Sequence, residues 1–122
     1  MDTINYRAIS QEDIAKIYSG KSSKFFQIVE DAFLKYDKNE VILPAKISQI
    51  FDQVTQNRIN CMPATLLKDK VSGMKWVSVF PTNATKGLQN VSGIMILSEI
   101  ETGFPIAVID GTLLTNIRTA SV

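Results

Sequence analysis

The chain has 122 residues, 45% of them hydrophobic and 20% charged, so it can form one globular domain and is too apolar for a disordered segment. The net charge is only +1, with acidic and basic residues intermixed, which excludes the basic stripe of a nucleic-acid-binding protein. No apolar run approaches the ~20 residues that cross a bilayer, and the polar N-terminus does not resemble a signal peptide. We therefore expect a cytoplasmic protein with neither a nucleic-acid nor a membrane partner.

The sequence contains no histidine and a single cysteine, Cys61. Without histidine, Ser-His and Cys-His nucleophiles and imidazole zinc ligands are excluded. Cys61 has no second cysteine for a disulfide or for a CxxC metal pair, so no metal site is expected. Any chemistry must therefore use lysine, arginine, carboxylates or a bound cofactor.

The first part of the chain has helical patterns. Ser10 and Asp13 resemble a capping box, and Ile14 and Ile17 continue it as a short apolar stripe. After a short connection, apolar residues recur at helical spacing and predict a second helix of about three turns. These apolar residues are Phe25, Val29, Ala32, Phe33 and Tyr36.

Strand-like runs follow the helices, at residues 41–44, 46–52, 58–64, 71–80, 93–98 and 104–109. Pro44 and Pro63 are expected at edges or strand ends. The last two runs form the clearest hairpin, because Gly103 in the turn between them suits a positive φ. A third helix is predicted from residue 110, with Asp110 or Thr112 as its cap.

This order of elements predicts an α+β fold. We expect a mostly antiparallel sheet of about six strands, with the helices packed on one face. Residues 1–122 are expected to form one domain. Because the last helical pattern reaches Val122 without a glycine, a basic last turn or a proline, we also expect that the chain is cut from a longer one.

Lys75 lies in the run 71–80, of which both faces are apolar enough to be covered by other elements. A buried ammonium costs roughly several kcal/mol unless it is paired, and it can lose its proton instead. The alternative is a lysine whose side chain follows the edge of the sheet to water.

Two further cations have apolar neighbours. Arg118 follows Leu114 by one helical turn, and we expect it within the first two turns of its helix, where backbone amides and a guanidinium together bind a carboxylate or phosphate. A surface ion pair with Asp110 is the alternative. Lys46 lies in a strand-like run, and the three cations together can hold one small anion, with Lys75 and Arg118 as its core.

Three blocks of sequence resemble the signature of the ornithine cyclodeaminase/mu-crystallin family. Residues 72–83 resemble its glycine-x-lysine strand and proline-x-asparagine loop, and residues 93–107 resemble its threonine-glycine-x-proline hairpin. Residues 110–120 are similar to its run that ends in arginine-threonine-alanine. The family joins a substrate-binding and dimerisation domain to a Rossmann NAD domain, and the resemblance covers the first of these. A homodimer is therefore expected, because the family joins its sheets across a two-fold axis.

The resemblance also implies roles for single residues. Lys75 and Arg118 are expected to bind the α-carboxylate of an L-amino acid, with Lys75 also taking part in catalysis and Arg118 also bordering the nicotinamide. Asn90 falls where some members touch the cofactor. Lys46 aligns with the family's first carboxylate-binding arginine but lacks the bidentate fork, which puts ornithine in doubt as substrate. A relative of the diaminopropionate-pathway dehydrogenases of siderophore synthesis is therefore an open alternative.

The family's chemistry implies NAD-dependent oxidation of an L-amino acid to an imine, with loss of ammonia in a cyclodeaminase, or imine reduction in a reductase. The acid-base aspartate of the family lies beyond this chain, and no GxGxxG loop occurs in the 122 residues. We therefore expect the fragment to be inactive alone, with NAD bound by the complete protein. The alternative is a non-catalytic dimeric binding module.

Overall fold

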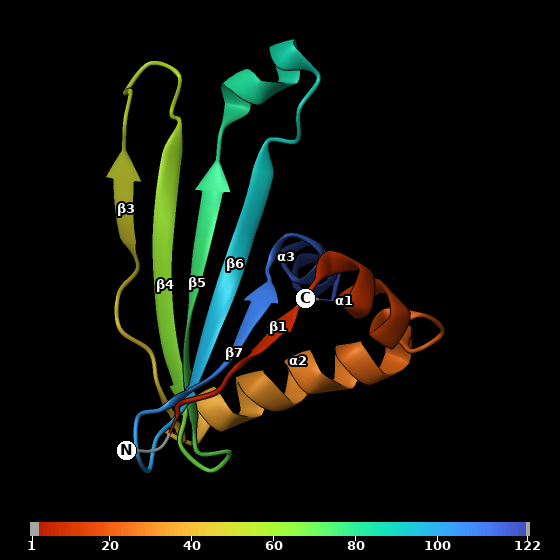
Figure 1. Cartoon of the computed structure of the whole chain (residues 1–122), viewed down its shortest axis with the longest axis vertical. Coiled ribbons are helices and arrows are strands. Elements are labelled where there is room, and N and C mark those ends of the chain that lie inside the picture. The colour runs from red at the N-terminus through yellow and green to blue at the C-terminus, as the bar shows by residue number, and fades with distance from the viewer. Residues whose placement is uncertain (1–2, 122) are drawn as a thin grey trace.

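The computed structural model describes residues 3–121, which form a seven-stranded sheet, three α-helices and one 3-10 helix (Figure 1). In chain order the elements are β1 (Arg7–Ile9), α1 (Gln11–Tyr18), α2 (Ser22–Asp37), β2 (Val41–Ile42), β3 (Ile47–Ile50), β4 (Arg58–Leu66), β5 (Val71–Val79), η1 (Pro81–Lys86), β6 (Val91–Glu99), β7 (Pro105–Asp110) and α3 (Thr112–Ala120).

The strands are ordered β1-β7-β6-β5-β4-β2, and β3 also pairs with β4. All pairs are antiparallel except β1 with β7, so the mostly antiparallel α+β prediction is confirmed and the sheet is mixed. The expected number of strands was wrong, because β1 was missed. Its three residues are too few to show the alternation from which a strand is predicted.

The segment after β5 and the end of the last helix also differ from the predictions. Residues 81–86 form η1 instead of an irregular polar loop, and Gly87 ends η1 with a φ of 68°. Gly103 has the positive φ that its hairpin turn predicts, 76°. The helix α3 ends at Ala120, and Val122, to which the pattern was expected to run, lies outside the described residues.

Proline 63 lies in the middle of β4 rather than at a strand end. β3 pairs with β4 up to Cys61, and β2 pairs with β4 from Thr65, so the outer side of β4 is unpaired between these two points. A proline has no N–H to donate and is tolerated where a strand has an open edge. The expectation of an edge position therefore holds locally, within a strand that is otherwise paired on both sides.

The first helix has the cap that its sequence predicts. The Ser10 hydroxyl accepts a hydrogen bond from the Asp13 amide at 3.1 Å, and the Ser10 amide donates to the Asp13 carboxylate at 3.0 Å. These bonds to Ser10 lower the pKa of Asp13. Ile14, on the apolar stripe of α1, is buried. No helix in residues 3–121 is long and apolar enough to cross a membrane.

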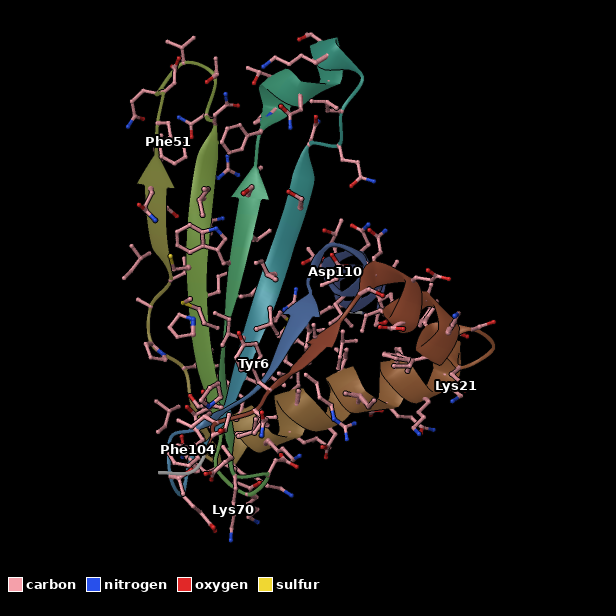
Figure 2. All side chains as sticks on the ribbon, viewed as in Figure 1. Tyr6, Lys21, Phe51, Lys70, Phe104 and Asp110 are labelled. Carbon is pink, nitrogen blue, oxygen red and sulfur yellow. The ribbon has the colours of Figure 1, made fainter. Side chains whose placement is uncertain are left out.

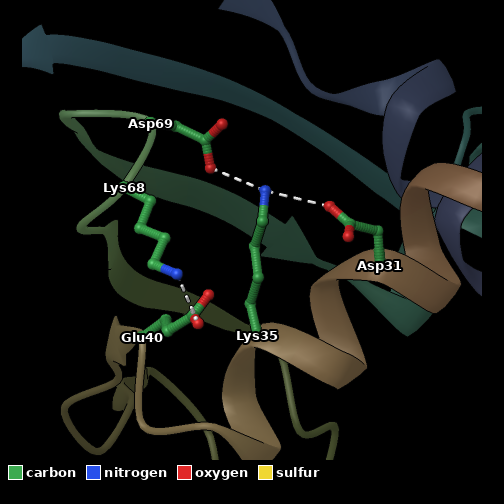
Figure 3. A network of polar contacts seen from close by, with 5 residues as sticks. All are labelled: Asp31, Lys35, Glu40, Lys68 and Asp69. Atoms are coloured by element: carbon green, nitrogen blue, oxygen red, sulfur yellow. Dashed lines mark hydrogen bonds and ion pairs between the residues drawn. The ribbon is translucent and has the colours of Figure 1, made fainter.

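The helix α2 has 16 residues and is longer than predicted. It is joined to the β4–β5 turn by Lys35, whose ammonium lies 2.9 Å from Asp31 and 2.8 Å from Asp69 (Figure 3). Hydrogen bonds to Asp69 and then Asp31 raise the pKa of Lys35. The apolar stripe predicted for this helix is mostly uncovered, since Phe33 and its neighbours are about half exposed.

The three helices lie on one side of the sheet (Figure 1). The side chains of Val77, Ala107, Ile14 and Ile117 are buried there, and we call this side of the sheet the helix-bearing face. Trp76 points to the opposite side, the open face, and is 38% exposed. The prediction that both faces of residues 71–80 are covered is therefore wrong for this chain, because the chain supplies helices to one face only.

Two glycines allow α3 to begin close to the sheet. The Gly111 amide donates to the Gly93 carbonyl at 2.8 Å, and the Gly93 amide donates to the Thr112 hydroxyl at 3.2 Å. A Cβ at Gly111 would lie 3.1 Å from the Gly93 carbonyl carbon. Figure 2 shows Asp110 at this junction between β7 and α3, and the Asp110 carboxylate accepts a hydrogen bond from the Leu113 amide at 3.3 Å. The position of α3 determines where Arg118 lies.

Candidate functional site

Lys75 is half-buried on the helix-bearing face of β5. Its cross-strand neighbours are Met62 on β4 and Met95 on β6, so both sides of the lysine are apolar. Because β5 lies inside the sheet, the alternative of a lysine that follows a sheet edge to water does not apply. Burial, and after it the positive charge of Arg118, lower the pKa of Lys75.

Arg118 lies on α3, close enough to Lys75 for its charge to act on that lysine. It is exposed and is the seventh residue of α3, so it lies within the first two turns, as predicted, and at the same time in the last turn. The reason is the shortness of the helix, which has nine residues. Within residues 3–121 Arg118 forms no ion pair, and the proposed partner Asp110 instead contacts the Leu113 amide.

Lys46 lies immediately before β3. The register pairs Ile47 with Cys61, and continuing it by one residue places Lys46 opposite Met62, whose other neighbour is Lys75. Lys46 and Lys75 therefore belong to one cross-strand row, two strand spacings or about 10 Å apart. The sequence-predicted cations thus share one region of the helix-bearing face, with Lys75 and Arg118 the nearer pair.

Asn90 lies just before β6, where its carbonyl accepts a hydrogen bond from the Phe80 amide at 2.7 Å. It lines an open hollow of about 420 Å³ together with Gln89 and with Asn116 of α3. The structure thus brings Asn90 to the helix that carries Arg118. Asn116 was missed by the sequence reasoning, and no pattern in the sequence distinguishes it from a surface residue.

Two further polar residues lie near the cations and were also missed. Asn60 is 7% exposed, and its side-chain oxygen accepts a hydrogen bond from the Ser48 hydroxyl at 2.7 Å. Asn60 lies opposite Val77, one row along the sheet from Lys75. The signal that could have indicated it is a single asparagine within the otherwise apolar residues 59–62.

The charges of this region are unbalanced. In the part of the chain that the structure describes, no carboxylate pairs with Lys46, Lys75 or Arg118. Two cations that face each other without a counter-ion destabilise one another, and a bound anion removes this cost. A half-buried lysine with a lowered pKa can also release or accept a proton more readily than a surface lysine. The arrangement is suited to binding a small anion next to a group that can transfer a proton.

Comparisons with known proteins identify the family of the chain. The sequence model of the ornithine cyclodeaminase/mu-crystallin family matches residues 10–122. Alanine dehydrogenase of Archaeoglobus fulgidus is 35% identical over 113 residues, which are 93% of this chain and 33% of that protein.

Two solved structures have the same fold. One, an archaeal alanine dehydrogenase dimer with bound NAD, is 34% identical with a TM-score of 0.84, over 95% of this chain and 34% of that one. The other, Δ1-pyrroline-2-carboxylate reductase of Thermococcus litoralis with NADH and L-proline, is 29% identical with a TM-score of 0.87, over 94% of this chain and 35% of that one.

The chain spans about a third of the length of these relatives. The match nevertheless covers nearly all of this chain, including the strands and the helix that carry Lys75 and Arg118. The chain therefore belongs to the ornithine cyclodeaminase/mu-crystallin family.

Proposed function

We propose that this chain is the substrate-binding part of a longer NAD-dependent enzyme that acts on an L-amino acid or the corresponding imine. The observation that carries this proposal is the pair of Lys75 and Arg118, two cations that act on each other with no carboxylate partner among the described residues. A carboxylate placed between them satisfies both charges. Lys46, in the same row as Lys75, adds positive charge at longer range.

Lys75 and Arg118 then have different tasks. The exposed guanidinium of Arg118 offers a fixed fork of donors to two carboxylate oxygens. The Lys75 ammonium makes a single-point contact from the floor of the site, and its lowered pKa favours transfer of a proton to or from the amino or imino nitrogen of the ligand. Lys75 is accordingly the residue to which we assign a catalytic role.

The residues present also fit one side of a nicotinamide cofactor. Asn90 and Asn116 offer two amide groups around one hollow, and Arg118 follows Asn116 by two residues on α3. Amides are suitable partners for a carboxamide and for ribose hydroxyls. NAD supplies the hydride acceptor or donor for the reaction. The 122 residues contain no GxGxxG loop, so we assign phosphate binding to another part of the complete protein.

An NMR titration with L-amino acids tests the carboxylate site. We expect L-alanine and L-norvaline to shift signals of β5 and α3, and Arg118→Ala and Lys75→Met each to weaken binding at least about 10-fold, the equivalent of one charge-assisted hydrogen bond. Lys24→Ala, at an exposed position on α2, is the matched control and should leave binding unchanged. Equal affinity of wild type and Arg118→Ala would contradict the assignment.

The substrate itself is tested with the complete protein. Steady-state assays with NAD⁺ and ornithine, lysine, alanine and phosphoserine distinguish a cyclodeaminase from a dehydrogenase, because only the cyclodeaminase releases ammonia without net reduction of NAD⁺. We expect the same assays on the 122-residue chain to show no turnover, since the chain offers only one side of the reaction site. Turnover by this chain alone would overturn that part of the proposal.

We also propose that two copies of the chain associate through the open face. Trp76 and Ile94 form one cross-strand row there with Ile47 and Cys61, and Ile47 is 63% exposed. Contiguous exposed apolar surface of this kind marks an interaction site. Sedimentation should give a dimer at micromolar concentration, and Ile94→Glu should yield a monomer, whereas Gln27→Glu on α2 should not. A monomeric wild-type protein would refute this assignment.

A further inference from the structure

A second group of polar side chains lies on the helix-bearing face, next to the three cations. Alternate residues of a strand point to the same face, and the register places Asn60 and Arg58 on the face of Lys75. Asn60 lies between Ser48 on β3 and Val77 on β5. Asn60 and Arg58 lie in the next two cross-strand rows after that of Lys46 and Lys75, toward the end of the sheet that carries η1 (Figure 1).

Asn60 has hydrogen-bonding capacity that the chain does not use. Its side chain is 7% exposed and bonds to the Ser48 hydroxyl at 2.7 Å, and the other atom of the amide contacts no hydrogen-bonding group within residues 3–121. The amide nitrogen still reaches solvent, because among residues 3–121 the side-chain polar atom that is fully buried without a partner is Thr115 Oγ1. The free half of this amide is therefore available to a ligand, and in either orientation the group is neutral.

The position of Asn60 fits the part of the ligand beyond its carboxylate. Diagonal neighbours on adjacent strands are about 7–8 Å apart, and Asn60 is the diagonal neighbour of Lys75. In the opposite direction along the sheet, the Leu97 side chain fills the space above Gly73, where a Cβ would lie 2.6 Å from it. Within residues 3–121 the parts of β3–β6 next to η1 lie beyond α1, α2 and α3 (Figure 1), so a ligand held at Lys75 extends toward Asn60.

We propose that Asn60 is a specificity residue, which with Ser48 receives the side chain of the amino acid and selects an uncharged or anionic group over an ammonium. This inference rests on the proposed function, since it requires the α-carboxylate to be held by Lys75 and Arg118. It narrows the substrate class to amino acids without a second amine in the side chain.

The charges around the site account for the selection. β3, β4, β5, η1 and α3 contain no acidic residue. Glu99 of β6 lies at the far end of the sheet, where it accepts hydrogen bonds from the Glu101 and Thr102 amides, and Asp110 accepts one from the Leu113 amide. Glu12 and Asp13 of α1 are paired with Lys16 and Ser10. Around Asn60 the register places the cations Lys46, Arg58 and Lys75, and Arg118 acts on Lys75. The Arg58 guanidinium donates to the Gln56 carbonyl at 2.9 Å. The nearby Asp52, in the β3–β4 turn, accepts hydrogen bonds from the Val54 and Thr55 amides.

An ammonium placed beside Asn60 would therefore have like charges around it and no counter-ion. For one like charge at 7–8 Å with an effective dielectric constant of 20, the repulsion corresponds to a roughly 10- to 100-fold weaker affinity. An uncharged side chain avoids this penalty. A carboxylate side chain gains attraction from the same cations, of which Arg58 lies on β4 two residues before Asn60.

Norvaline, ornithine and glutamate provide the test, because norvaline has the carbon chain of ornithine without its second amine. NMR titration of the 122-residue chain should show norvaline and glutamate binding at least about 10-fold more tightly than ornithine. Asn60→Asp, which adds a negative charge at nearly constant volume, should shift the ornithine-to-norvaline affinity ratio at least about 10-fold toward ornithine. Arg58→Gln should weaken glutamate relative to norvaline, and Lys24→Ala should change neither ratio.

The outcomes separate this inference from the proposed function. If norvaline binds but ornithine binds equally well, the selection is refuted while the carboxylate site stands. The same holds if folded Asn60→Asp leaves the ratio unchanged. If no amino acid binds, the proposed function fails and the inference with it. If circular dichroism shows that Asn60→Asp does not fold, the wild-type ratio and the Arg58→Gln ratio decide.

Discussion

Replacing Gly93 by alanine tests whether the close contact between β6 and α3 determines the geometry of the site. A Cβ at position 93 would lie 2.8 Å from the Trp76 carbonyl oxygen and 3.2 Å from the Val77 Cα, both backbone atoms. Because ordinary contacts need about half an ångström more, either β5 or β6 must move. Overpacking of this kind costs roughly 1–3 kcal/mol of the free energy of unfolding.

The same substitution should act on the charges of the site. Gly93 forms hydrogen bonds with both Gly111 and Thr112 at the start of α3, so movement at Gly93 displaces the helix that carries Arg118. The pKa of Lys75 is lowered by burial and by Arg118, and displacement of Arg118 should therefore raise it toward the ordinary lysine value. An effect on stability and an effect on Lys75 are expected together.

Urea denaturation followed by the fluorescence of Trp76, at fixed protein concentration, measures the first effect. An NMR pH titration of the lysine Cε signals measures the second. Ser92→Ala, at the exposed neighbouring position on β6, is the matched control and should stay within about 0.5 kcal/mol of wild type. A Gly93→Ala variant as stable as wild type, with an unchanged Lys75 pKa, would refute the reasoning.

Three other predictions concern single residues and the cofactor. The folded-state pKa of Lys75 lies below its ordinary value of 10.5, so the unfolded state binds more protons at pH values between the two. The free energy of unfolding should therefore rise with pH in this range. Lys75→Met should remove that rise in matched denaturation series. Ser10→Ala should cost about 1 kcal/mol in thermal or urea denaturation, since the cap of α1 is lost, and a cost below about 0.3 kcal/mol would count against the capping box. Calorimetry of the 122-residue chain with NAD⁺ should show no saturable micromolar binding, and such binding would show that phosphate recognition does not need a glycine-rich loop.

The types of most elements could be read from the sequence because they depend on neighbours along the chain. The cap of α1 involves residues three apart, and the turn at Gly103 needs only a local positive φ. Elements with weak local patterns were missed or misplaced. β1 is too short to show an alternation, and η1 contains no apolar period at all.

The residues of the candidate site likewise divide into those that the sequence predicted and those that it missed. Lys75 and Arg118 were identified because a cation among apolar residues is unusual at any position, and the family resemblance gave them a shared role. Asn60 and Ser48 were missed because each is an ordinary residue until the β3–β4–β5 register places Asn60 diagonally next to Lys75 and Ser48 opposite Asn60. The last-turn position of Arg118 likewise depended on where α3 ends, which its sequence pattern did not indicate.

By itself the sequence determined the α+β class, the antiparallel hairpins and the cations of the site, since periodicity and unusual charges are local properties of a chain. Only the tertiary structure decided which face of the sheet the helices cover, that Trp76 and Ile94 remain exposed on the other face, and that Arg118 lies near enough to Lys75 to lower its pKa. These features depend on pairing between residues far apart in the chain. The energies of these features depend on burial and on the distances between charges, and both are defined only after the strands have paired in register.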